Sequence, residues 1–170
     1  AGLYCGKFRI GAGGDYWKSP NNQGESARSE LQLKNTAPAG RELYYSWKLK
    51  IDPAYPESKD WQVIGQFHDQ PDPAMGQTWA LYPANSPPVA FRYEDGPLVL
   101  AVYSWAILGV KDIASLPLTK GEWHRITTRI LWSTGNGGFV EAWLDGVPLK
   151  FQDGTTRHSG RNCFNNAGNY

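Results

Sequence analysis

The amino-acid sequence predicts an all-β protein, a jelly-roll β-sandwich of two antiparallel sheets with a concave substrate groove. Apolar residues recur at every second position along most patterned segments, and no stretch repeats them at the spacing of an amphipathic helix. Aromatic residues reach 14% of the chain, with eight Trp and nine Tyr against one Met, a bias that favours strands. At 170 residues the chain suits one domain with a buried core, so we expect residues 1–170 to form a single domain.

The alternation gives each expected strand a core face and a solvent face. In 61–68, Trp61, Val63, Gly65 and Phe67 are expected on the core face, and Gln62, Ile64, Gln66 and His68 on the other. Strands are expected at 28–34, 43–51, 61–68, 78–82, 89–94, 97–103, 123–132 and 139–145. Turns are marked by Asp95-Gly96, by 135–138 and by Asp145-Gly146. Strands at this spacing fit a jelly roll.

Polar side chains on the solvent faces of these strands form the candidate site. They are Arg28 and Glu30 from 28–34, Tyr44 and Lys48 from 43–51, Gln66 and His68 from 61–68, and Arg125 from 123–132. Most residues of this kind serve only solubility, because a solvated sheet face ordinarily carries Lys, Glu and Thr. Gln66 and His68 differ, since an amide and an imidazole stand two residues apart at the end of a strand whose reverse face is strongly apolar.

These residue types fit the eliminative cleavage of a uronate polymer. That reaction must neutralise the carboxylate, remove the C5 proton and protonate the leaving glycosidic oxygen. Arg and Gln side chains can donate hydrogen bonds to a carboxylate whose charge grows as the enolate forms. His suits neutralisation or proton transfer near neutral pH. A Tyr phenol is the usual partner, because it can act as a base and then as an acid.

Several short segments, in this order, resemble those of the jelly-roll polysaccharide lyases. Residues 27–31, Ala-Arg-Ser-Glu-Leu, resemble the Arg-Ser/Thr-Glu-Leu motif, and residues 64–68, Ile-Gly-Gln-Phe-His, resemble the Gln-aliphatic/aromatic-His motif. The segments 43–52, 121–126 and 132–146 resemble further strands and hairpins, so the resemblance covers nearly the whole chain. Within the group the likeness is to the glucuronan lyase and heparin lyase I type. Gln32 argues against an alginate lyase, which usually carries Arg or Lys there.

The resemblance implies roles for individual residues. Arg28 and Gln66 would neutralise the substrate carboxylate, His68 would assist neutralisation or proton transfer, and Glu30 would orient Arg28. A third family motif, Tyr-Phe-Lys-x-Gly-x-Tyr, carries the proton-transfer Tyr at its final position, and the printed sequence ends at Tyr170, apparently the first residue of that motif. We expect a chain continuing beyond Tyr170, or a neighbouring copy, to supply the missing strand and activity to require it. The remaining possibility is that this protein is not an active enzyme.

Charge and cysteine content limit the partners and the cellular location that the sequence predicts. A net charge of +1 gives no basic field for nucleic acid, and the longest apolar stretch, 98–110, is too short to span a bilayer. We therefore expect an acidic polysaccharide as partner, and neither nucleic acid nor a membrane. Cys5 and Cys163 are expected to form one disulfide in a secreted, extracellular protein, with two free thiols as the alternative. No cofactor is expected, and a structural calcium ion near 69–72 or 165–169 stays open.

Two functions of other classes compete with a lyase. A non-catalytic carbohydrate-binding module uses the same fold; the absent Tyr favours it, and the combination of Arg28, Gln66 and His68 disfavours it. A self-associating structural protein would use sheet edges that the absent strand leaves open. A glycoside hydrolase is disfavoured, because no convincing pair of carboxylates falls on one strand face.

Overall fold

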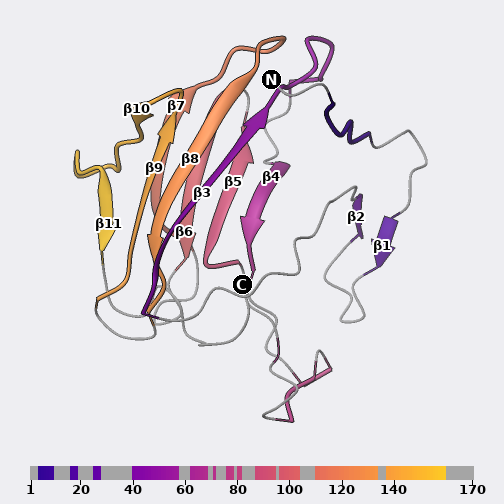
Figure 1. Ribbon diagram of the computed structural model, residues 1–170. Coiled ribbons are helices and arrows are strands. Elements are labelled where there is room, and N and C mark those ends of the chain that lie inside the picture. Colours follow the sequence, from indigo (N-terminus) through magenta and orange to yellow (C-terminus); the bar gives the residue numbers. More distant parts are fainter. Residues whose placement is uncertain are drawn as a thin grey trace. The chain divides into compact units, whose positions relative to one another are not determined.

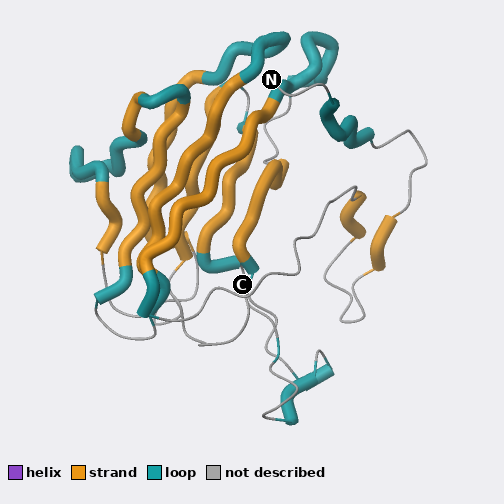
Figure 2. The backbone as a smooth tube through the Cα atoms, in the orientation of Figure 1, coloured by secondary structure: helices purple, strands orange, loops and turns teal. Residues whose placement is uncertain are grey.

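All regular elements are strands in the residues that the computed structural model describes (Figures 1 and 2), which are 4–9, 16–18, 25–27, 40–57, 62–68, 71, 76–78, 80–81, 87–94, 96–103, 110–133 and 137–159. The chain's contacts form two compact units, Ala1–Lys34 and Asn35–Tyr170. In the first, β1 (Tyr16–Lys18) pairs antiparallel with β2 (Glu25–Ala27). Across the described ranges, no helix is long and apolar enough to cross a membrane.

The larger sheet of the second unit has five antiparallel strands. They are β3 (Glu42–Leu49), β8 (His124–Leu131), β9 (Phe139–Leu144), β10 (Val147–Pro148) and β11 (Arg157–Ser159). The order is β10-β9-β8-β3, and β11 also pairs with β9. Figure 1 shows β3, β8 and β9 running side by side. Long central strands with short pieces at one edge give this sheet a broad, continuous outer face.

The second sheet has four antiparallel strands in sequence order, β4-β5-β6-β7. They are β4 (Gln62–Phe67), β5 (Val89–Tyr93), β6 (Pro97–Tyr103) and β7 (Val110–Pro117). The turn between β5 and β6 includes Gly96 at a φ of 116°, a backbone conformation that side chains rarely adopt. A turn was expected at this position.

The core lies between the two sheets. The ring of Trp47 from β3 meets Phe91 from β5 edge to face at 5.1 Å, and Tyr45 meets Phe67 from β4 at 4.6 Å. Such contacts stabilise the sandwich through apolar burial and ring geometry together. The largest fully buried side chains include Trp132, Tyr93, Phe91, Leu98, Leu100, Ile126 and Ile130. The prediction of two packed antiparallel sheets is therefore confirmed.

One strand prediction was wrong, and one strand of the structure was not predicted. Residues 78–82 were expected to form a strand, but Thr78 and Leu81 belong to a turn closed by a 3.0 Å hydrogen bond from the Leu81 N–H to the Thr78 carbonyl. The Leu81 side chain is 82% exposed, so its apolar character was a misleading signal. Strand β7 was missed, because its ladder with β6 shifts register at the point where Tyr103 pairs with Val110. An irregularity of this kind interrupts the alternation on which the prediction depended.

A β-bulge in β4 corrects the expected burial of Val63. The register with β5 shifts between Val63 and Gly65, so Ile64 and Gly65 both turn toward the core. Val63 is 41% exposed instead of buried, whereas Phe67 packs against the core as predicted. A Cβ on Gly65 would lie 3.3 Å from the Trp47 indole, so glycine lets the two sheets approach at this point. The bulge was not visible in the sequence, and it leaves Gln66 on the outer face.

The hairpin after β9 is fixed by a buried histidine. Asp145 and Gly146 both have positive φ, of 52° and 85°, as the predicted Asp-Gly turn requires. The Asp145 carboxylate accepts hydrogen bonds from the Arg125 N–H at 2.7 Å and from His124 Nδ1 at 2.6 Å. The other ring nitrogen of His124 lies 2.9 Å from the Thr119 carbonyl oxygen. A protonated imidazole satisfies both acceptors at once.

We expect the His124–Asp145 pair to make stability depend on pH. Burial alone lowers the pKa of His124, but the hydrogen bonds to Asp145 and Thr119 together raise it above its ordinary value. The Arg125 N–H and His124 lower the pKa of Asp145. The histidine contribution is thus complete below its unfolded pKa of about 6.5 and is lost as pH rises through the higher folded value; the aspartate contribution is present above about 3.9 and is lost on acidification.

Urea unfolding of wild type and Asp145→Asn across this range checks that dependence. The two proteins should differ most in free energy of unfolding between about pH 4 and 6.5, and the difference should narrow above that window. A difference that grows steadily toward alkaline pH would contradict the assignment. The variant Glu122→Gln, which removes an exposed carboxylate that acts on His124 only through space, is the control and should change the pH dependence much less.

Three sequence predictions concern residues that lie wholly or partly outside the described part of the chain. The expected strand 28–34, with Arg28 and Glu30, lies there, as does Cys163. Cys5 is an exposed cysteine without a disulfide, so the Cys5–Cys163 bridge is not confirmed. The loops considered for calcium also fall almost wholly outside the described residues, and within those residues no cluster of three or more metal-ligating side chains occurs.

Candidate active site

Gln66 and His68 lie at the end of β4, in the four-stranded sheet. Phe67 between them packs into the core, so the alternation of the strand directs its two neighbours to the outer face. Gln66 is exposed and His68 is half-buried. The prediction that Gln66 points away from the core is therefore confirmed. His68, two residues later, is on the same face.

The outer face beside Gln66 is lined by small residues. Gln66 pairs with Ala90 on β5, and Ala90 pairs with Ala101 on β6. Both alanines are buried, although they point away from the core between the sheets. In the row of Gln66, β5 and β6 therefore contribute only methyl groups, and both are covered.

Arg92 is a cation on this same face that the sequence interpretation missed. It stands on β5 two residues from Ala90, opposite Val63, which makes it a diagonal neighbour of Gln66 at about 7 Å between Cα atoms. Its residue is only 6% exposed, and the guanidinium forms a 2.9 Å ion pair with Glu94. The signal that could have found it is a single Arg at an outward position in the otherwise apolar strand Val89–Tyr93.

Tyr103 supplies a phenol on the same face. Its N–H donates to the Pro88 carbonyl at 2.9 Å, and Phe67 pairs with Val89, so Tyr103 and His68 fall in the same row of the sheet. Two strand spacings separate their Cα atoms, about 10 Å. Tyr103 is half-buried. Four groups therefore share one outer face: an amide, an imidazole, a guanidinium and a phenol.

The other predicted site residues that the structure describes lie on the other sheet. Tyr44 and Lys48 are exposed on β3, and Arg125 is exposed on β8, where Lys48 and Arg125 are directly paired. Their side chains point away from the core, as those of Gln66 and His68 do, but from the opposite side of the sandwich. The structure thus does not bring Tyr44, Lys48 and Arg125 together with Gln66. The alternation showed which residues face solvent, but it carried no information about which sheet each strand joins.

A comparison with models of protein families assigns the chain to a group. Residues 2–169 match the family described as polysaccharide lyase. The chain belongs to the polysaccharide lyase family. A comparison with curated proteins finds no significant match.

A solved structure supports the fold of this polysaccharide lyase family member. The crystal structure of an endo-β-1,4-glucuronan lyase from the fungus Trichoderma reesei is similar, with a TM-score of 0.53 at 18% sequence identity. The likeness covers 70% of the present chain and 51% of the fungal chain, so the present chain spans about half the length of its structural neighbour. The lyase jelly roll predicted from the short motifs is confirmed as a fold.

Proposed function

We propose that the protein cleaves a uronate-containing acidic polysaccharide, of the glucuronan type, by β-elimination at the outer face of the four-stranded sheet. The observation that carries the proposal is the shared placement of Gln66, His68, Arg92 and Tyr103 on that face. Membership of the polysaccharide lyase family supports the reaction class. The likeness to a glucuronan lyase supports the fold in which such a site works. A secreted location accords with a polymeric substrate.

The first task of the site is to stabilise the substrate carboxylate. The Gln66 amide is exposed and donates N–H groups to the carboxylate, whose negative charge grows as the C5 proton leaves. Arg92 is its diagonal neighbour on the same face, and the ion pair with Glu94 holds the guanidinium in place there. Arg28, the neutralising group that the family resemblance implies, lies outside the described residues.

The second task is proton transfer. His68 removes the C5 proton or assists its removal. A phenol donates a proton to the departing glycosidic oxygen. Tyr103 is the tyrosine of the described residues that lies in the row of His68. The elimination breaks the C4–O bond, forms a C4–C5 double bond and leaves an unsaturated uronate at the new end.

A panel of acidic polysaccharides tests the proposal. We expect ultraviolet absorbance of the unsaturated product to rise with glucuronan and to stay flat with a neutral glucan. Tyr103→Phe removes one hydroxyl and should lower kcat by about 10²-fold or more, with KM little changed, because the phenol acts in the transition state. If Tyr103→Phe keeps wild-type kcat, proton transfer belongs to another tyrosine, such as one beyond Tyr170. Tight binding of polymer without any product would instead favour the carbohydrate-binding alternative.

A further inference from the structure

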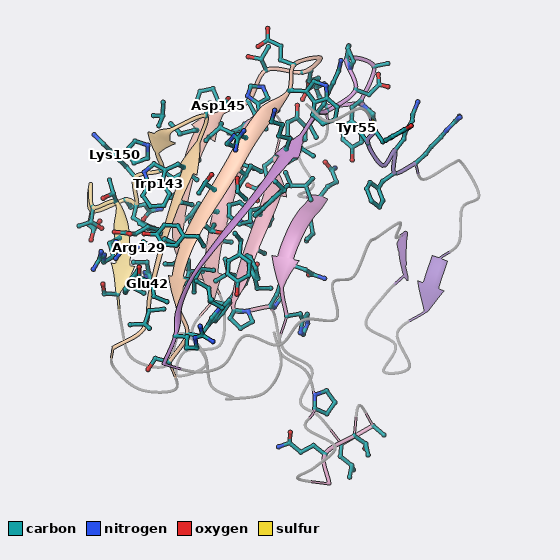
Figure 3. All side chains as sticks on the ribbon, in the orientation of Figure 1. Glu42, Tyr55, Arg129, Trp143, Asp145 and Lys150 are labelled. Carbon is teal, nitrogen blue, oxygen red and sulfur yellow. The ribbon has the colours of Figure 1, made fainter. Side chains whose placement is uncertain are left out.

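The outer face of the five-stranded sheet carries features that the proposed reaction does not use. We call it the Tyr44 face, and define it by the outward side chains Tyr44 and Lys48 of β3, Arg125 and Arg129 of β8, and Trp143 of β9. Figure 3 labels Arg129 and Trp143 on this sheet. Tyr44 is 64% exposed, an unusual position for a ring on a sheet face. Trp143 is half-buried, and an exposed ring and a partly exposed ring interleaved with cations are features of a binding surface.

Two like charges stand opposite each other on the Tyr44 face. Lys48 on β3 is the register partner of Arg125 on β8, and both side chains are exposed. Like charges in this arrangement destabilise a sheet. Asp145, on which the Arg125 charge acts through space, already accepts hydrogen bonds from His124 and from the backbone of Arg125. An anion placed between the Lys48 and Arg125 side chains would relieve their mutual repulsion.

A chain of ion pairs holds the neighbouring part of the face rigid. Arg129 forms a bidentate contact with Glu42, at 2.7 and 3.0 Å, and a third hydrogen bond to Glu141 at 3.1 Å. Arg157 on β11 completes the chain through Glu141 at 2.8 Å. The Arg129 guanidinium lies 5.8 Å from the centre of the Tyr44 ring. A ring supported in this way loses little freedom when a ligand stacks on it.

The spacing of the groups suits an extended chain. Trp143 lies two strands from Tyr44 and two residues along, about 12 Å between Cα atoms, and Lys48 lies about 13 Å from Tyr44 on the same strand. A single sugar ring cannot span these groups, whereas an oligosaccharide can. Aromatic faces fit the apolar faces of pyranose rings, and the Lys48–Arg125 pair fits a carboxylate.

We propose that the Tyr44 face is a second, non-catalytic binding surface for an acidic polysaccharide. The nature of the polymer rests on the proposed function, but the surface is separate from the candidate active site, because it belongs to the opposite sheet. Tyr44 and Trp143 stack on sugar rings, and Lys48 with Arg125 binds a uronate carboxylate. The surface keeps the enzyme on the polymer between cleavage events.

Binding and cleavage can be measured separately to test this. Affinity of the protein for glucuronan is measured by calorimetry in a His68→Ala background, so that the polymer stays intact. Lys48→Ser/Arg125→Ser and Tyr44→Ala should each weaken binding about tenfold, and salt should weaken wild-type binding. Without the His68 substitution, the same variants should keep wild-type kcat on a short oligosaccharide. Thermal unfolding verifies that each variant is folded.

A charge-matched control makes the test specific. Lys7→Ser/Arg9→Ser removes two exposed cations from the N-terminal unit and should leave affinity nearly unchanged. Unchanged affinity in the Lys48/Arg125 variant, or an equal loss in the control, would overturn the inference. So would a result in which the variants disrupt only self-association, measured by sedimentation, because a second copy of the chain would then occupy the face. If the wild-type protein cleaves no polymer, only the proposed lyase function is rejected. The binding measurements still test whether the Tyr44 face binds an acidic polysaccharide.

Discussion

Replacing His68 by alanine is expected to lower kcat/KM on glucuronan by about 10²–10⁴-fold, the range that a positioned proton-transfer group contributes. Gln66→Ala should cost about 10²-fold or more, because it removes a donor to the carboxylate in the transition state. Neither residue belongs to the core, since Gln66 is exposed and His68 half-buried, so the free energy of unfolding should change by less than about 1 kcal/mol. Initial rates of unsaturated product formation and urea unfolding measure the two effects.

Two further variants sharpen that experiment. Gln66→Glu keeps the shape of the side chain but sets a negative charge against the substrate carboxylate, so it should be at least as damaging as Gln66→Ala. Lys150→Ala removes an exposed cation from beside the five-stranded sheet and should leave the rate within about twofold. Wild-type rates for both His68→Ala and Gln66→Ala would show that the chemistry lies elsewhere.

Replacing Trp132 by alanine is expected to lower the free energy of unfolding by about 3–5 kcal/mol, the range for removing a buried aromatic side chain. Trp132 has no exposed surface, and its ring contacts Phe67 at 5.6 Å between centroids. Its Nε1 donates a hydrogen bond to the Tyr45 hydroxyl at 2.9 Å. The substitution removes this donor from the Tyr45 hydroxyl. Against a total stability of about 5–15 kcal/mol, this loss is a large fraction of the free energy that keeps the protein folded.

The same substitution, Trp132→Ala, should also disturb the candidate active site. Phe67 lies between Gln66 and His68 in β4, so a cavity beneath Phe67 loosens both neighbours. Activity measured well below the unfolding midpoint should fall. Trp123→Ala is the matched control, because Trp123 is 44% exposed; it should change stability by no more than about 1 kcal/mol. Trp132→Phe keeps most of the packing, so its loss of stability should lie between those of Trp132→Ala and Trp123→Ala. Equal stability losses at Trp132 and Trp123 would contradict this description of the core.

Local patterns in the sequence correctly predicted the class of fold and the side-chain directions at the C-terminal end of β4, although not the bulge at Val63–Gly65. Period-two alternation, together with Asp145-Gly146 and the β5–β6 turn, is local information, since side-chain direction and turn conformation depend on neighbouring residues. For the same reason Phe67 was correctly predicted to pack in the core and Gln66 to leave it. The lyase motifs, which are also local, led to the family that residues 2–169 match.

Which polar faces share a side of the sandwich depends on long-range strand pairing, which local sequence patterns do not contain. Tyr44, Lys48 and Arg125 have the same outward alternation as Gln66, yet β3 and β8 join one sheet and β4 the other. Pairing between strands distant in sequence is set by packing across the whole core, as in the contact of Trp47 with Phe91 and Gly65. The same packing placed the bulge that exposes Val63, and it brought Arg92 and Tyr103 to the face of Gln66. Strand periodicity specifies a side chain's direction relative to its own strand, whereas a site depends on the partners that the strand acquires.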